Sequence, residues 1–170
     1  TLQSPDAFQP ELVRLCAESG VAVVFVPELP RLRVSGAARW ISPRKALIQL
    51  SLRYKTNDHL WFSFFHEAGH ILLHGKRSMF IDDGDGSDGK EAEANTLAAN
   101  FLIPPAIYER LKATNPPTEP AVLQASKEAG VAPGIIVGRL QHDGLLRYDQ
   151  MNHLKKHFTW VPIKAEQTAA

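Results

Sequence analysis

Residues 64–75, FFHEAGHILLHG, place two histidines four positions apart, with a glutamate directly after the first. On an α-helix, side chains four apart lie on one face, so His66 and His70 can direct ring nitrogens at a single ion. Glu67 is offset by about 100 degrees around the helix, where it can reach an ion-bound water without ligating the ion. This H-E-x-x-H arrangement predicts a metal-dependent hydrolase helix, with His66 and His70 as ligands and Glu67 as the general base.

The alternative is a buried helix whose histidines are satisfied by ordinary hydrogen bonds. The surrounding segment is apolar almost all round, which predicts a helix at the centre of the fold. An unpaired glutamate in such a place would cost several kcal/mol, whereas beside an ion-bound water it has a role. Glu67 therefore favours the catalytic interpretation.

A catalytic zinc keeps three protein ligands, so one more is needed besides the two histidines. His74 lies two turns from His66, and the mismatch between 3.6 and 4 residues per turn carries it about 80 degrees off that face. The next predicted helix offers Glu91 and Glu93. We prefer Glu91 because Asn95, four residues on, faces the same way and can support a ligand through a hydrogen bond. Glu93 stays the alternative.

The elements that must position these residues follow from periodicity and turn signals. Residues 4–20 predict a short helix ended by Gly20, and the β-branched run at 21–27 predicts a strand. Residues 38–52 predict a hairpin, and these strands together predict a small antiparallel sheet. A free edge of the hairpin strand at 45–52 could then bind a peptide as an added strand.

The H-E-x-x-H helix is predicted to begin at Asn57 or Asp58 and to stop at Gly75. Four aspartates and three glycines between residues 81 and 90 predict a surface loop. A second helix over 91–103 and further helices after Pro104 follow. A helix, a small sheet and then helices indicate an α+β fold.

Composition limits the class of protein. With 170 residues, 44% of them hydrophobic, the chain is long enough for one packed domain. We expect that domain to span 1–146, with the sheet and active-site helices in 1–104 and a helical part in 105–146, followed by a basic extension over 147–170. The formal charge of +1 gives no sign of a surface for nucleic acid or an anionic membrane.

The cellular setting is predicted from what the sequence lacks. A single cysteine, Cys16, excludes an internal disulfide, which fits a reducing compartment. No signal segment or membrane span is evident, so we expect a cytoplasmic protein without a membrane partner. The chain opens at Thr1 and not at methionine, which leaves open an upstream domain.

Two motifs in order, HEAGHILLHG and EAEANTLAANFLIP, resemble the ImmA/IrrE family of bacterial metallopeptidases. The second family motif reads E-x-x-A-[ND]-x-[FL]-A-x-x-[FL]-[LI]-x-P, and this chain follows it from Glu91 to Pro104. The likeness covers most of residues 10–150, and the acidic loop 82–89 is the departure. It implies a zincin-like, gluzincin-type domain in which His66, His70 and Glu91 hold zinc and Glu67 acts as the general base. Manganese is the alternative metal for two imidazoles and a carboxylate.

The resemblance also implies a protein substrate. Family members typically cut a helix-turn-helix repressor, such as the repressor of a stress operon or of a mobile element, and some carry such a domain upstream. Peptide hydrolysis needs a donor for the oxyanion besides the metal. Tyr54, His74 and His142 are the candidates, and the sequence does not choose among them.

Weaker signals support a rival function, a metal-containing sensor or a nucleic-acid-binding regulatory module without peptidase activity. The stretch ASKEAGVAPGIIVGRL resembles a helix-turn-helix, although its second helix has one basic residue and suits core packing better than a DNA groove. The tail from Arg147 to Trp160 mixes basic and aromatic residues, a composition compatible with single-stranded nucleic acid as an activator. A solvated helix face is the simpler interpretation of that tail.

Overall fold

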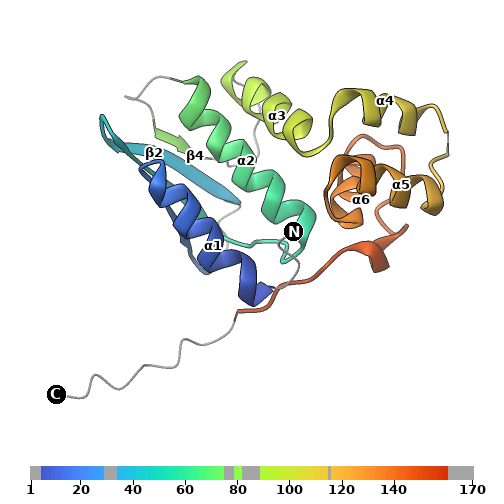
Figure 1. The fold of residues 1–170 in the computed structure, drawn as a ribbon, viewed down its shortest axis with the longest axis horizontal. Helices are drawn as coiled ribbons and strands as arrows, with labels where there is room; N and C mark the ends of the chain where they lie inside the picture. Colours follow the sequence, from blue (N-terminus) through green and yellow to red (C-terminus); the bar gives the residue numbers. More distant parts are fainter. Residues whose placement is uncertain (1–4, 29–33, 75–78, 82–88, 115, 161–170) are drawn as a thin grey trace.

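The computed structural model describes residues 5–28, 34–74, 79–81, 89–114 and 116–160. A four-stranded sheet with a helix against it occupies one side, and the later helices gather on the other, with the long helix α2 running between them (Figure 1). In chain order the elements are α1 (Pro5–Glu18), β1 (Val21–Phe25), β2 (Gly36–Ser42), β3 (Lys45–Leu50), α2 (Asn57–Leu73), β4 (Met79–Ile81), α3 (Gly89–Leu102), α4 (Pro105–Lys112), α5 (Glu119–Ala129), α6 (Pro133–His142) and the 3₁₀ turn η1 (Asn152–Leu154).

The sheet has the strand order β1-β3-β2-β4 and is mixed, which confirms the α+β class but corrects the prediction of an all-antiparallel sheet. The hairpin β2–β3 is antiparallel, as predicted, whereas β1 pairs parallel with β3. Phe25 of β1 and Gly36 of β2 both lie opposite Leu50, so the chain leaves β1 and enters β2 at the same end of the sheet. The strands β1 and β2 therefore run in opposite directions. Since β3 lies between them and is antiparallel to β2, it runs parallel to β1.

The prediction of a free edge on the strand at 45–52 is wrong, because β3 has β1 on one side and β2 on the other. The strand β4, which the sequence did not predict, covers the other edge of β2 through an antiparallel pairing of Arg39 with Met79. Ile81 thus belongs to a strand, and Gly89 already opens α3. The rest of the predicted acidic loop, and the predicted helix stop at Gly75, lie outside the described residues.

The helix α2 is apolar all round because it packs on two hydrophobic clusters. Leu60, Phe64 and Ile71 are buried against α1 and the sheet. Phe62 packs against a second cluster, formed by the ends of α3 and α4 with α5 and α6, and Phe65 contacts both clusters. Burial on both faces explains why α2 shows no polar stripe.

The cap at the N-terminus of α2 differs from the predicted one, which was Asn57 or Asp58. The cap residue is Thr56, whose side chain makes no capping hydrogen bond. The buried Asn57 side chain instead accepts a hydrogen bond from the backbone N–H of Lys156, at 3.0 Å. The Asn57 N–H donates to the Lys156 carbonyl at 2.9 Å, so the C-terminal segment satisfies a backbone donor that a helix start leaves open.

That C-terminal segment is not the solvated helix that we expected. After η1 it is extended, and its aromatic residue Phe158 is buried against Phe8, with ring centroids 5.3 Å apart. Two of its basic residues are paired, Lys155 with Asp58 at 2.6 Å and Arg147 with Asp149 at 2.5 Å. These contacts give no support to a nucleic-acid surface here. The domain boundary at residue 146 stays a prediction.

The helix-turn-helix interpretation of α5 and α6 is equally unsupported. The would-be recognition helix α6 is buried through Ile135, Ile136, Val137 and Leu140. Its Gly138 packs on the start of α2 so closely that a Cβ there would lie 2.4 Å from Asp58 Oδ2. A helix held in this way cannot present a face to a DNA groove.

Among the described residues, no helix is long and apolar enough to cross a lipid bilayer.

Candidate metal centre

The two histidines of the H-E-x-x-H helix lie side by side inside the protein. Their Nε2 atoms are 3.0 Å apart, and their exposed fractions are 2% for His66 and 0% for His70. One helical turn separates them along α2, so both rings leave the same face, as the spacing predicts.

The helix α3 supplies the carboxylate that joins the two rings. Glu91 Oε2 lies 3.1 Å from His66 Nε2, and Oε1 lies 3.1 Å from His70 Nε2. One ligand atom from each of the three residues falls within 4.8 Å of the other two. Glu93 instead points outward, with its side chain 68% exposed and Oε2 4.0 Å from His74.

Asn95 orients the first histidine. Its Oδ1 lies 2.9 Å from His66 Nδ1. An amide oxygen only accepts, so Nδ1 carries a proton, and the neutral ring then presents its Nε2 lone pair toward Glu91. Lone pairs that face a carboxylate at 3.1 Å repel it unless a proton or a cation lies between them.

This donor set fits a metal ion. Three atoms held about 2.0–2.1 Å from one tetrahedral zinc would lie roughly 3.3 Å from one another. Here the two Nε2 atoms are 3.0 Å apart, and each lies 3.1 Å from a different oxygen of the Glu91 carboxylate. Two neutral imidazoles and one carboxylate are also the ligand types that catalytic zinc uses. The three side chains are therefore close enough to share one ion.

A glycine inside the motif permits this approach of α2 and α3. A Cβ at Gly69 would lie 3.2 Å from the Cα and 3.3 Å from the Cβ of Ala94, which is fully buried. Any larger residue would push α3 away and carry Glu91 and Asn95 with it. The second x position of the motif is thus not free, and the small residue Ala94 on α3 is the matching signal in the sequence.

Glu67 lies on the sheet side of α2. It is fully buried, and a Cβ at Gly36 of β2 would come within 2.5 Å of its Oε1 and 2.8 Å of its Cγ. The missing side chain at position 36 therefore makes the space for the glutamate. The sequence held no signal for this pairing, because the two residues are 31 positions apart in separate elements.

The substitution Gly36→Ala is expected to lower peptide cleavage at least 10-fold while the bound metal is retained. The added methyl group displaces the Glu67 carboxylate without touching a ligand, and overpacking of this kind costs about 1–3 kcal/mol of stability. Cleavage rate, metal content and urea unfolding of the same preparation measure these effects. Gly89→Ala is the matched control, since a Cβ there meets nothing within 4 Å. Equal activity in both variants would contradict the proposed packing role.

The three oxyanion candidates are in different places. His74 Nε2 lies 3.1 Å from the Lys90 carbonyl, and its ring packs on His70 with centroids 5.1 Å apart. Tyr54 is exposed and stacks on His59, and His59 lies two turns before His66 on α2. His142 Nδ1 lies 2.8 Å from Asp143 Oδ1, and the exposed ring lines a cavity next to α2. The geometry brings only His74 into contact with a candidate ligand.

A buried histidine pair joined to a glutamate of the next helix, on an α+β scaffold, defines a zincin-like domain with a candidate metal centre. A protein-family model, Peptidase_M78 (IrrE N-terminal-like domain), matches residues 30–141, and the chain belongs to this peptidase family. The match confirms the family resemblance of the two motifs. No curated protein matched the chain.

Proposed function

We propose that this protein is a zinc-dependent endopeptidase that cleaves a regulatory protein, a helix-turn-helix repressor of a stress, mobile-element or defence operon. The observation that carries the proposal is the convergence of His66 Nε2, His70 Nε2 and the Glu91 carboxylate within 3.1 Å of one another. Membership of a peptidase family supports the reaction class. The repressor as substrate rests on the resemblance to ImmA/IrrE proteins.

Each residue of the centre has a role in this proposal. His66, His70 and Glu91 hold the metal, and Asn95 keeps the proton on His66 Nδ1 so that Nε2 can ligate. The metal, when bound, supplies a Lewis acid that polarises the scissile carbonyl and activates water. Glu67 accepts the proton of the attacking water and transfers it to the leaving amine. Tyr54, His74 and His142 remain the candidates for the oxyanion donor.

Cleavage of candidate repressors tests this function. The purified chain, loaded with one equivalent of zinc, is incubated with the helix-turn-helix repressors encoded beside its gene, and products are identified by mass spectrometry. One defined cut is expected, and it should disappear after treatment with a chelator and return with added zinc. Zinc binding without cleavage of any such repressor would refute the substrate assignment, and failure to bind zinc would refute the reaction.

A further inference from the structure

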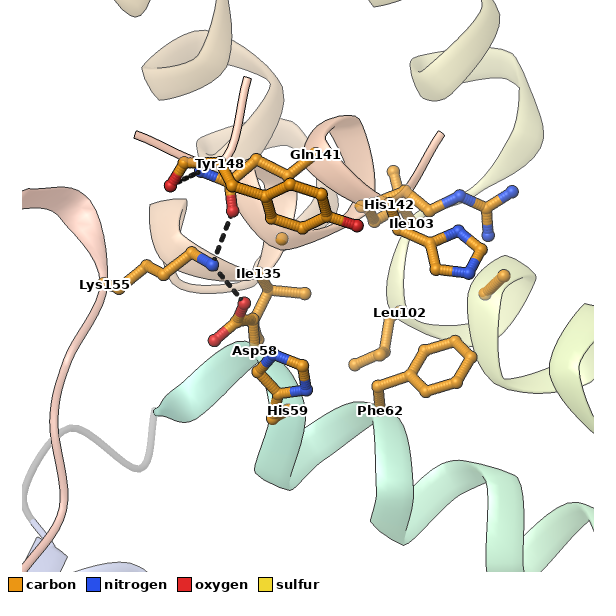
Figure 2. Close-up of a pocket in the computed structure, with 13 residues that line it drawn as sticks. Asp58, His59, Phe62, Leu102, Ile103, Ile135, Gln141, His142, Tyr148 and Lys155 are labelled. Carbon is orange, nitrogen blue, oxygen red and sulfur yellow. Dashed lines mark hydrogen bonds and ion pairs between the residues drawn. The ribbon is translucent and has the colours of Figure 1, made fainter. Parts of the chain in front are cut away.

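A cavity of about 130 Å³ lies between α2, α3 and α6, and Figure 2 shows the residues that line it. Two of its lining residues fix its place. Phe62 precedes His66 by one turn of α2, and the two rings stack with centroids 6.3 Å apart. Ala99 follows Asn95 by one turn of α3. Along α2 the cavity therefore begins one helical turn, about 5.4 Å, before the proposed ligand His66, and along α3 it begins about two turns after Glu91.

The walls of this cavity are mainly apolar. They come from Phe62 of α2, Ala99 and Leu102 of α3, Ile103 just after it, and Ile135 of α6. Such a lining recognises hydrocarbon, since each buried CH₂ group contributes about 0.8 kcal/mol. The composition thus selects an apolar ligand group.

Three polar residues at one end of the cavity are bonded to one another, while Arg139 and His142, which also line it, are both paired with Asp143. Lys155 Nζ lies 2.6 Å from Asp58 Oδ2 and donates to Gln141 Oε1 at 2.7 Å, and Figure 2 shows both contacts. The side chains of Lys155 and Asp58 are only 10% and 7% exposed. A charged guest would have to compete with this buried pair, at a desolvation cost of several kcal/mol. An apolar guest leaves the pair intact.

An exposed aromatic side chain forms the rim. The residue Tyr148 is 74% exposed, yet it lines the cavity, and Figure 2 places its ring across the cavity from Phe62. Its backbone is held by a hydrogen bond from Asn152 Nδ2 to its carbonyl, at 2.7 Å. A ligand in the cavity would cover part of this exposed ring and so remove apolar surface from water.

We propose that this cavity receives an apolar side chain, of leucine or phenylalanine size, from the substrate residue next to the cleaved bond. The proposal rests on the proposed peptidase function, because it takes the metal centre as the place of cleavage. The size agrees, since an engineered protein cavity of about 150 Å³ holds benzene. When the carbonyl of the cleaved bond lies at the metal centre, the neighbouring substrate side chain has to reach about one turn of α2 beyond His66 to enter the cavity.

A pair of small chelating probes tests the cavity without any need for turnover. Leucine hydroxamate and glycine hydroxamate carry the same metal-binding group and differ only in the side chain. Isothermal titration calorimetry on the zinc-loaded chain is expected to give at least 10-fold tighter binding of leucine hydroxamate. In Ala99→Leu, which fills the cavity, that ratio should fall to about one, while glycine hydroxamate binds as before.

Two further variants keep the test decisive. Tyr148→Ala removes an exposed wall that folding does not need, and it should lower the ratio several-fold even if Ala99→Leu fails to fold. Ala106→Leu adds the same side chain at an exposed site on α4 and should leave the ratio unchanged. Equal affinity for the two probes in the wild type, or an unchanged ratio in Tyr148→Ala, would overturn the cavity proposal alone. Failure of glycine hydroxamate to bind would overturn the metal centre and the cavity proposal with it.

Discussion

Glu67→Gln is expected to reduce cleavage by about 10²–10⁴-fold, the contribution of a positioned general base, while the metal stays bound. The amide has the shape of the carboxylate, so it fits the space that Gly36 leaves beside α2. It cannot accept a proton from water at neutral pH. The loss should therefore fall on the chemical step and not on the fold.

Single-turnover cleavage of the proposed repressor substrate, with metal content measured on the same sample, separates the two effects. Glu93→Gln is the matched control, because its side chain is 68% exposed and lies 4.0 Å from His74. This control should cleave at the wild-type rate. A Glu67→Gln protein that remained fully active would refute the proposed mechanism, and one that lost its metal would mean that Glu67 has a structural or ligating role instead.

Glu91→Ala is expected to weaken zinc binding by more than the roughly 10–100-fold that loss of a supporting hydrogen bond costs. The Glu91 carboxylate is the group that contacts both imidazoles, at 3.1 Å each. Its removal leaves two neutral ligands on one helix and no negative charge facing the ion. Cleavage should disappear together with the metal.

Competition with a chromophoric chelator measures the affinity, and thermal unfolding with and without zinc gives a second measurement. A ligand that binds only the folded state raises its stability, so the zinc-dependent rise in Tm should be lost in Glu91→Ala. Glu93→Ala should keep both the affinity and the rise. The opposite pattern would assign the third ligand to Glu93, the alternative that the sequence left open.

The two predictions probe residues that are positioned by different neighbours of α2. Glu91 reaches the histidines from α3, while Glu67 lies against β2. Both neighbours approach closely, through Gly69 on the α3 side and Gly36 on the sheet side. A centre held between two packed layers is fixed in place, which reduces the reorganisation needed during the reaction.

Local spacing by itself determined the helices and their faces. The H-E-x-x-H segment forms a helix with His66 and His70 on one face, and the second motif forms α3 with Glu91 and Asn95 one turn apart. The β2–β3 hairpin also follows from its alternating residues and its turn at Pro43. These features depend on residues within a few positions of one another, where helix and strand periods decide the outcome.

Tertiary structure alone decided the contacts between distant elements. The insertion of β3 between β1 and β2, the pairing of β4, and the return of residues 156–158 to the start of α2 required pairings that no local pattern encodes. The same is true of the fit of Glu67 to Gly36 and of the cavity between α2, α3 and α6. Each depends on how side chains from separate elements fill one shared volume, and close packing settles that only when the whole chain has folded.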